Sequence, residues 1–121
     1  MHTDKPNLIV DLSFEFALEV VVFTELLECK RKFNMANQLF RSGTSIGANV
    51  HEAQNAESKK DFIHKIKIAA QEAEETKYWL LICQHSINYP DQLLKNIDAI
   101  NKMLTKIIAT AKSVITDSSS K

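Results

Sequence analysis

Apolar side chains recur at alternating spacings of four and three residues in four long segments of this 121-residue chain. This spacing places them on one face of an α-helix, because a helix has 3.6 residues per turn. A half-buried β-strand would instead alternate apolar and polar residues at every second position. The pattern therefore predicts an all-α protein. The third segment shows it most clearly, with Phe62, Ile66, Ala69, Ala73, Thr76, Leu80, Cys83 and Ile87 in one row.

The four segments have similar lengths and short connections, which favour an antiparallel up-down-up-down four-helix bundle. We expect one domain over residues 1–121, and potential capping residues help to place the helix starts. The expected N-caps are Asp11 or Ser13, Asn34 and Ser58 (with Asp61 completing a capping box), and Pro90 is the expected first residue of the last helix. The predicted helices span residues 12–32, 35–56, 59–86 and 90–116.

The only two glycines, Gly43 and Gly47, lie one turn apart inside the second predicted helix. A glycine in a helix interior costs about 1 kcal/mol relative to alanine. We therefore predict that another backbone comes close to this face of the helix. The alternative is that the two glycines only weaken the helix.

Polar residues form a row beside these glycines. Arg41, Ser45, Asn49 and Glu52 recur at spacings of four, four and three, and Glu75 of the third helix is a candidate partner for Arg41 or Asn49. The structural interpretation is a network that fixes the register of the two helices. The functional interpretation is a polar binding groove.

Fifteen basic and fifteen acidic residues cancel, so bulk charge does not favour nucleic acid, membrane or an acidic partner. The lysines are nevertheless clustered, and residues 59–67 carry a net charge of +3. Such a cluster could contact RNA phosphates. Solubility and helix-dipole pairing are the alternative roles for these residues. The candidate contacts are Lys59, Lys60, Lys65 and Lys67.

Recognisable catalytic and metal-binding patterns are missing from the sequence. No two histidines have the helical spacing of a metal site, and no glutamate is followed by a histidine three residues later. Neither Ser42 nor Ser45 has a histidine within one turn on its own helix face. We expect no enzymatic activity, no metal and no cofactor.

The two cysteines, Cys29 and Cys83, show no disulfide framework, so we expect two reduced, buried thiols in a cytoplasmic protein. The N-terminus opens no apolar run, and the longest apolar stretch is too short to span a bilayer. We therefore expect neither a signal peptide nor a membrane segment.

The first and third helices carry more apolar residues than one core face needs, for example Phe14 and Val22 in the first, or Ile68 and Trp79 in the third. An excess of apolar surface on a small protein usually marks an interface. The sequence therefore predicts a homo-oligomer, and a thicker core stripe is the alternative explanation.

Three blocks of sequence resemble one bacterial four-helix-bundle family. The run from Gln38 to Ala53, QLFRSGTSIGANVHEA, resembles the central motif of that family, and residues 58–62 and 72–80 resemble its next two blocks. The family is known as a ribosomal protein family and as the protein encoded in intervening sequences of 23S rRNA genes. The residues that match its motifs are Arg41, Ser42, Ser45, Ile46, Asn49, Glu52, Ser58, Lys59, Lys60, Phe62, Glu75, Trp79 and Leu80.

The resemblance implies an antiparallel four-helix bundle and a homo-oligomer, most simply a pentameric barrel. It carries no catalytic role. The family is similar to the accessory protein of diversity-generating retroelements, which associates with a reverse transcriptase and with RNA through a basic surface. The present chain departs from that accessory protein in being neutral, with an acidic first helix.

Two hypotheses about function remain. The first is a non-enzymatic oligomer associated with RNA or a ribonucleoprotein through the lysine cluster. The second is a protein-interaction scaffold that does not bind RNA directly.

Overall fold

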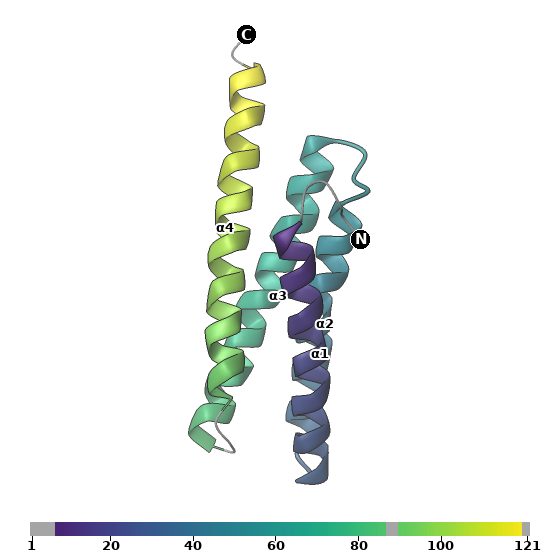
Figure 1. Ribbon diagram of the computed structural model, residues 1–121, viewed down its shortest axis with the longest axis vertical. Helices are drawn as coiled ribbons and strands as arrows, with labels where there is room; N and C mark the ends of the chain where they lie inside the picture. The colour runs from purple at the N-terminus through teal and green to yellow at the C-terminus, as the bar shows by residue number, and fades with distance from the viewer. Residues whose placement is uncertain (1–6, 87–89, 120–121) are drawn as a thin grey trace.

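The computed structural model describes residues 7–86 and 90–119, which form four long helices (Figure 1). Consecutive helices run in opposite directions, and each helix contacts its two neighbours in the order α1, α2, α3, α4 and back to α1. The predicted all-α, up-down-up-down four-helix bundle is confirmed. The helices are α1 (Leu8–Cys29), α2 (Phe33–Ala53), α3 (Lys59–Ser86) and α4 (Asp91–Ser119).

Helix α1 begins earlier than predicted, at Leu8 rather than at residue 12. Both expected N-caps are wrong, because Asp11 and Ser13 lie inside the helix. Packing explains the extension: Ile9 and Val10 are buried, so the first turn contributes to the core. The buried hydroxyl of Ser13 is satisfied within the helix by the carbonyl of Val10, at 3.2 Å.

Helix α1 also ends earlier than predicted, because residues 30–32 form the turn into α2. Arg31 adopts a left-handed conformation with φ of 62°. The amide of Lys32 donates to the carbonyl of Leu27, and the amide of Arg31 donates to the carbonyl of Glu28, both at 2.8 Å. This pair of hydrogen bonds is a Schellman motif, which terminates the helix.

The starts of the other helices follow the sequence more closely. Helix α2 begins at Phe33, so Asn34 is not its cap, and it ends at Ala53 rather than at residue 56. Helix α3 spans residues 59–86 as predicted, and the Ser58 hydroxyl accepts a hydrogen bond from the Asp61 amide at 3.0 Å. The Asp61 carboxylate reaches the Glu57 amide instead of completing the box at the cap. Pro90 immediately precedes α4 and is not its first residue as predicted, and the helix extends to Ser119 rather than ending at residue 116.

The core lies where the four predicted apolar rows meet, which run from Phe16 to Leu27, from Ala36 to Ala53, from Phe62 to Ile87 and from Leu93 to Val114. Most of their members are buried, but Phe23, Phe62 and Ile107 are only half-buried, and Val114 is 44% exposed. Ile87 lies outside the described residues. The largest fully buried side chains are Phe16, Val20, Leu27, Leu39, Ile46, Val50, Ile66, Thr76, Leu80, Ile97, Ile100 and Leu104.

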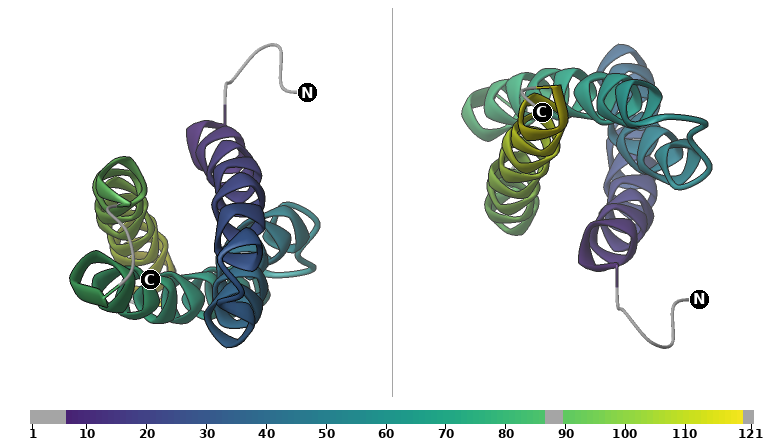
Figure 2. Two further views of the ribbon diagram at one scale, coloured as in Figure 1. Left: turned by 90° about the horizontal axis from the view of Figure 1, so that it is seen from below. Right: turned by 90° about the horizontal axis from the view of Figure 1, so that it is seen from above.

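The bundle is less closed between α1 and α4 than elsewhere. Viewed end on, α3 lies between α2 and α4, whereas α1 and α4 diverge on the opposite side (Figure 2). Helix α4 has 29 residues and α1 has 22, a difference of roughly 10 Å at 1.5 Å per residue. The C-terminal end of α4 accordingly projects beyond the other helices (Figure 1).

Candidate functional site

The two glycines bring α1 against α2, but they do so in different ways. A methyl group on Gly43 would lie 2.8 and 2.9 Å from the two Cγ atoms of Val20. A methyl group on Gly47 would lie 3.3 Å from the backbone carbonyl oxygen of Ser13. The expected close approach of another backbone is therefore found at Gly47, whereas a buried side chain fills the space at Gly43.

Arg41 joins α2 to α3 through two carboxylates. Its guanidinium donates to Glu72 at 3.2 Å and forms a second ion pair with Glu75. Glu75 also accepts a hydrogen bond from the Trp79 indole at 2.9 Å. The hydrogen bonds from Trp79 and then Arg41 lower the pKa of Glu75, and the bond to Glu75 raises the pKa of Arg41. The predicted contact between Arg41 and Glu75 is present.

The rest of the polar row does not form one network across the helices. The hydroxyl of Ser45 donates to the backbone carbonyl of Arg41 at 2.6 Å. The side-chain amide of Asn49 donates to the backbone carbonyl of Ser45 at 2.9 Å. Both groups are thus satisfied on their own helix. Glu52 forms an ion pair with Lys65 of α3 at 3.0 Å. The row therefore joins α2 to α3 only at its two ends, through Arg41 and Glu52, and does not form the single network of the structural interpretation.

One buried contact between α2 and α3 is not predictable from the sequence pattern. The hydroxyls of Thr76 and Ser42 are hydrogen-bonded at 2.9 Å, and both residues are fully buried. The sequence pattern puts Thr76 in an apolar row and gives no partner for Ser42. The two hydroxyls meet only because α2 packs against α3.

The structure divides the four candidate RNA-contacting lysines. Lys59, Lys60 and Lys67 are exposed, whereas Lys65 points toward α2 and is paired with Glu52. The hydrogen bond to Glu52 raises the pKa of Lys65. A charge already neutralised in this way contributes less to the binding of phosphate.

Lys67 instead lies against Lys112 of α4. Contact with the Lys112 side chain, and then its charge, lowers the pKa of Lys67. Neither lysine forms an ion pair with any described side chain. Lys60 lies two helical turns before Lys67, on the same face of α3, since residues seven apart share a face. We refer to Lys60, Lys67 and Lys112 as the basic cluster.

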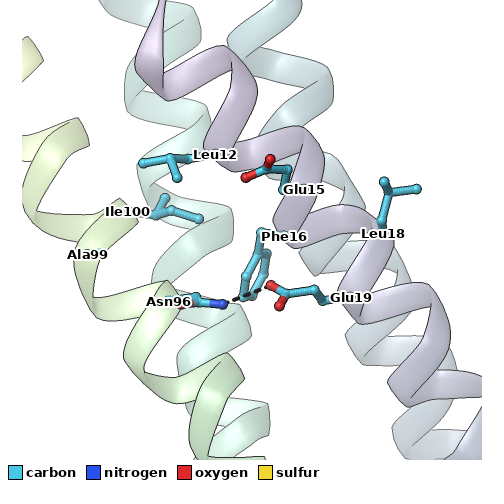
Figure 3. Close-up of a pocket in the computed structure, with 8 residues that line it drawn as sticks. All are labelled: Leu12, Glu15, Phe16, Leu18, Glu19, Asn96, Ala99 and Ile100. Atoms are coloured by element: carbon cyan, nitrogen blue, oxygen red, sulfur yellow. Dashed lines mark hydrogen bonds between the residues drawn. The ribbon is translucent and has the colours of Figure 1, made fainter.

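A shallow groove lies between α1 and α4, on the more open side of the bundle. Its volume is about 400 Å³, and two carboxylates, Glu15 and Glu19, stand at its α1 side. The amide of Asn96 donates to Glu19 at 2.8 Å, which is the hydrogen bond drawn across the groove in Figure 3. Leu12 of α1 and Ile100 of α4 both line the groove (Figure 3). This arrangement presents one paired and one free carboxylate above an apolar floor.

The thiols differ from the expectation that both would be buried. Cys83 is buried, and its burial raises the pKa of the thiol to about 11. Cys29 is exposed, because it is the last residue of α1 and lies away from the core. Among the described residues, no three histidine, cysteine, aspartate or glutamate side chains come together as a metal site requires. Within the same part of the chain, no helix is long and apolar enough to cross a lipid bilayer.

The fold and its surfaces define a four-helix-bundle protein in which ion pairs join α2 to α3 and α3 to α4, and in which lysines of α3 and α4 form a basic cluster. The model of the 23S rRNA-intervening sequence protein family matches residues 5–109, and the chain belongs to that family. No curated protein matches the chain.

A solved relative supports the same assignment. It is a protein of unknown function from the S23 ribosomal protein family of Bacteroides thetaiotaomicron VPI-5482. That protein is 41% identical to the present chain, with a TM-score of 0.78. The match covers 83% of this chain and 97% of the relative. The family resemblance inferred from the sequence motifs is thereby confirmed, and neither comparison assigns a catalytic activity.

Proposed function

We propose that this chain is a non-enzymatic, self-associating cytoplasmic protein that contacts RNA through the basic cluster of Lys60, Lys67 and Lys112. The observation that carries the proposal is that these three exposed lysines have no ion-pair partner among the described residues, while Lys67 and Lys112 face each other across α3 and α4. Two ammonium groups repel each other, and here no described carboxylate compensates them. An anion such as a backbone phosphate would relieve this repulsion, because it attracts both charges.

Self-association is supported by the exposed apolar side chains of α1. Phe14, Leu18 and Val22 are each more than half exposed. A row of this kind on a small protein is typical of an interface. Self-association in a pentamer, as the family resemblance suggests, would repeat the basic cluster around the assembly and so increase the avidity for a long polyanion.

Salt-dependent RNA binding tests the proposal. We expect the Lys67→Glu, Lys112→Glu double variant to lose most of its affinity for a structured RNA at low salt, and its dependence on salt to become shallower. The matched control is the Lys30→Glu, Lys95→Glu double variant, which changes the net charge equally at exposed sites outside the cluster. Equal losses in the two variants would show that the cluster has no special role.

A protein-interaction scaffold without direct RNA binding is the alternative function. The exposed apolar row of α1 favours it, because this row could serve a protein partner as well as a second copy. The scaffold hypothesis predicts no RNA retention at physiological salt and co-purification of a protein partner. An absorbance ratio at 260 and 280 nm on protein purified at low salt, together with light scattering, separates the two functions.

A further inference from the structure

Charge is strongly segregated between α1 and the rest of the chain. Helix α1 contains five carboxylates and no lysine or arginine: Asp11, Glu15, Glu19, Glu25 and Glu28. The whole chain has fifteen residues of each sign. Fifteen basic residues therefore stand against ten acidic ones outside α1, which gives that remainder a net charge of +5. The chain is neutral overall because one acidic helix offsets the net positive charge of the remaining residues.

The outer face of α1 is apolar as well as acidic. Phe14, Leu18 and Val22 follow one another at four-residue intervals with exposures of 53%, 53% and 67%. Residues four apart are neighbours on a helix surface, so these side chains form a continuous row. Glu15 and Glu25 lie on either side of it by the helical spacing. We call these five residues the α1 face.

A second surface, on α4 from Lys102 to Val114, has the complementary character. Lys102 and Lys106 are exposed, Met103 and Ile107 are half-buried, and Val114 is 44% exposed. Only the C-terminal end of this helix projects beyond the other helices (Figure 1). Met103 and Ile107 pack partly against the core, and their remaining accessible surface lies with Val114 beside the two lysines. We call these five residues the α4 face.

We propose that the α4 face of one copy docks on the α1 face of a second copy. The inference rests on the self-association proposed above and names the two surfaces that it uses. A symmetric pairing of two α1 faces is disfavoured, because it would bring two acidic helices together. When the α4 face lies on the α1 face, the apolar side chains of the two copies bury each other. The lysines of one copy then meet the glutamates of the other.

The pairing determines the kind of assembly. Each copy carries both faces, so one contact leaves an α4 face free on one copy and an α1 face free on the other. Such a head-to-tail contact continues from copy to copy until the rotation closes a ring. A closed ring would leave no docking face unoccupied. The basic cluster of Lys60, Lys67 and Lys112 shares no residue with the α4 face.

Reversal of charge tests the pairing. The acidic-face variant is Glu15→Lys with Glu25→Lys, and the basic-face variant is Lys102→Glu with Lys106→Glu. None of these four side chains has a hydrogen bond or ion pair with a described residue, so each variant is expected to keep its helical circular dichroism spectrum. We expect each variant alone to associate at least tenfold more weakly than the wild type in light scattering.

Restoration is the decisive measurement. The chain with all four substitutions has its charges exchanged, so we expect it to regain the wild-type mass. An equimolar mixture of the two double variants is expected to co-assemble, because each supplies the face that the other has lost. The Lys30→Glu, Lys95→Glu variant is the control for net charge and is expected to keep the wild-type mass.

The outcomes separate this inference from the proposed function. A wild-type protein that is monomeric at high concentration would overturn both self-association and the pairing. An oligomeric wild type whose mass is unaffected by either reversal would overturn only the pairing, since association then uses another surface. Dissociation of both variants without restoration in the fourfold variant would also contradict the pairing of these two faces.

Discussion

The contact between Gly43 and Val20 allows a sharp prediction about packing of α1 on α2. In the Gly43→Ala variant, the new methyl group would lie 2.8 and 2.9 Å from the two Cγ atoms of Val20. Carbon atoms in favourable contact are roughly 3.5–4.0 Å apart, so the helices must separate by more than half an ångström. Val20 cannot turn away, because it is fully buried and its β-branched side chain has one strongly preferred rotamer in a helix.

The magnitude follows from two opposing effects. Overpacking a core typically costs about 1–3 kcal/mol, whereas replacing a mid-helix glycine with alanine stabilises the helix by about 1 kcal/mol. We therefore expect Gly43→Ala to destabilise the protein by about 1 kcal/mol. Gly47→Ala is the matched control, since its methyl group would lie 3.3 Å from the Ser13 carbonyl and needs a much smaller movement. There we expect a change near zero or a slight stabilisation.

Urea denaturation followed by circular dichroism measures both changes, at one protein concentration because association affects stability. The double variant Gly43→Ala, Val20→Ala removes the clash, so the two substitutions should be less destabilising together than the sum of the single effects, by about 1 kcal/mol. If Gly43→Ala proves as stable as Gly47→Ala and the two substitutions add, the contact at Val20 does not limit the approach of α1.

Two further predictions concern the turn after α1 and the buried thiol. Arg31→Gly is expected to raise the free energy of unfolding by about 0.5–1 kcal/mol, because glycine adopts the left-handed φ of 62° without steric cost; a lower urea midpoint would contradict this reading. Burial raises the pKa of Cys83 from 9.0 to about 11, so the unfolded thiol ionises first as the pH rises. The contribution of Cys83 to the free energy of unfolding should therefore stay constant below pH 9. Between pH 9 and about 11 it should fall by up to about 2–3 kcal/mol. The Cys83→Ala variant should lose less free energy of unfolding than the wild type over this pH range. An equal loss in both proteins would show that Cys83 is not the group responsible. In the folded protein a thiol reagent should modify Cys29 rapidly and Cys83 only on unfolding.

The helix ends show where local sequence patterns stop being decisive. Ser58 was predicted as a cap and does cap α3, because its bond to the Asp61 amide lies within one turn. Asp11 and Ser13 were equally good candidates by type, yet α1 continues past them toward its N-terminus. The burial of Ile9 and Val10 outweighs the cap, and that burial depends on neighbouring helices. Capping contributes about 1 kcal/mol, whereas burying one large aliphatic side chain contributes about 1.5–3 kcal/mol.

The candidate surfaces were predictable only in part. The lysines of residues 59–67 were visible as a cluster, but the sequence could not show that Lys65 is paired with Glu52. It also could not show that Lys112, 45 residues after Lys67, lies against it. Long, flexible side chains reach partners on neighbouring helices, so spacing along one helix does not predict their partners.

The alternation of four and three residues by itself determined the helices, their number and the side of each that faces the core, because helical periodicity is a local property of the chain. The tertiary structure alone decided which side chain meets each glycine, how far α1 and α4 diverge and which charges face one another. These features depend on the distances between helices, and those distances are set by the summed volumes of side chains that are far apart in the sequence.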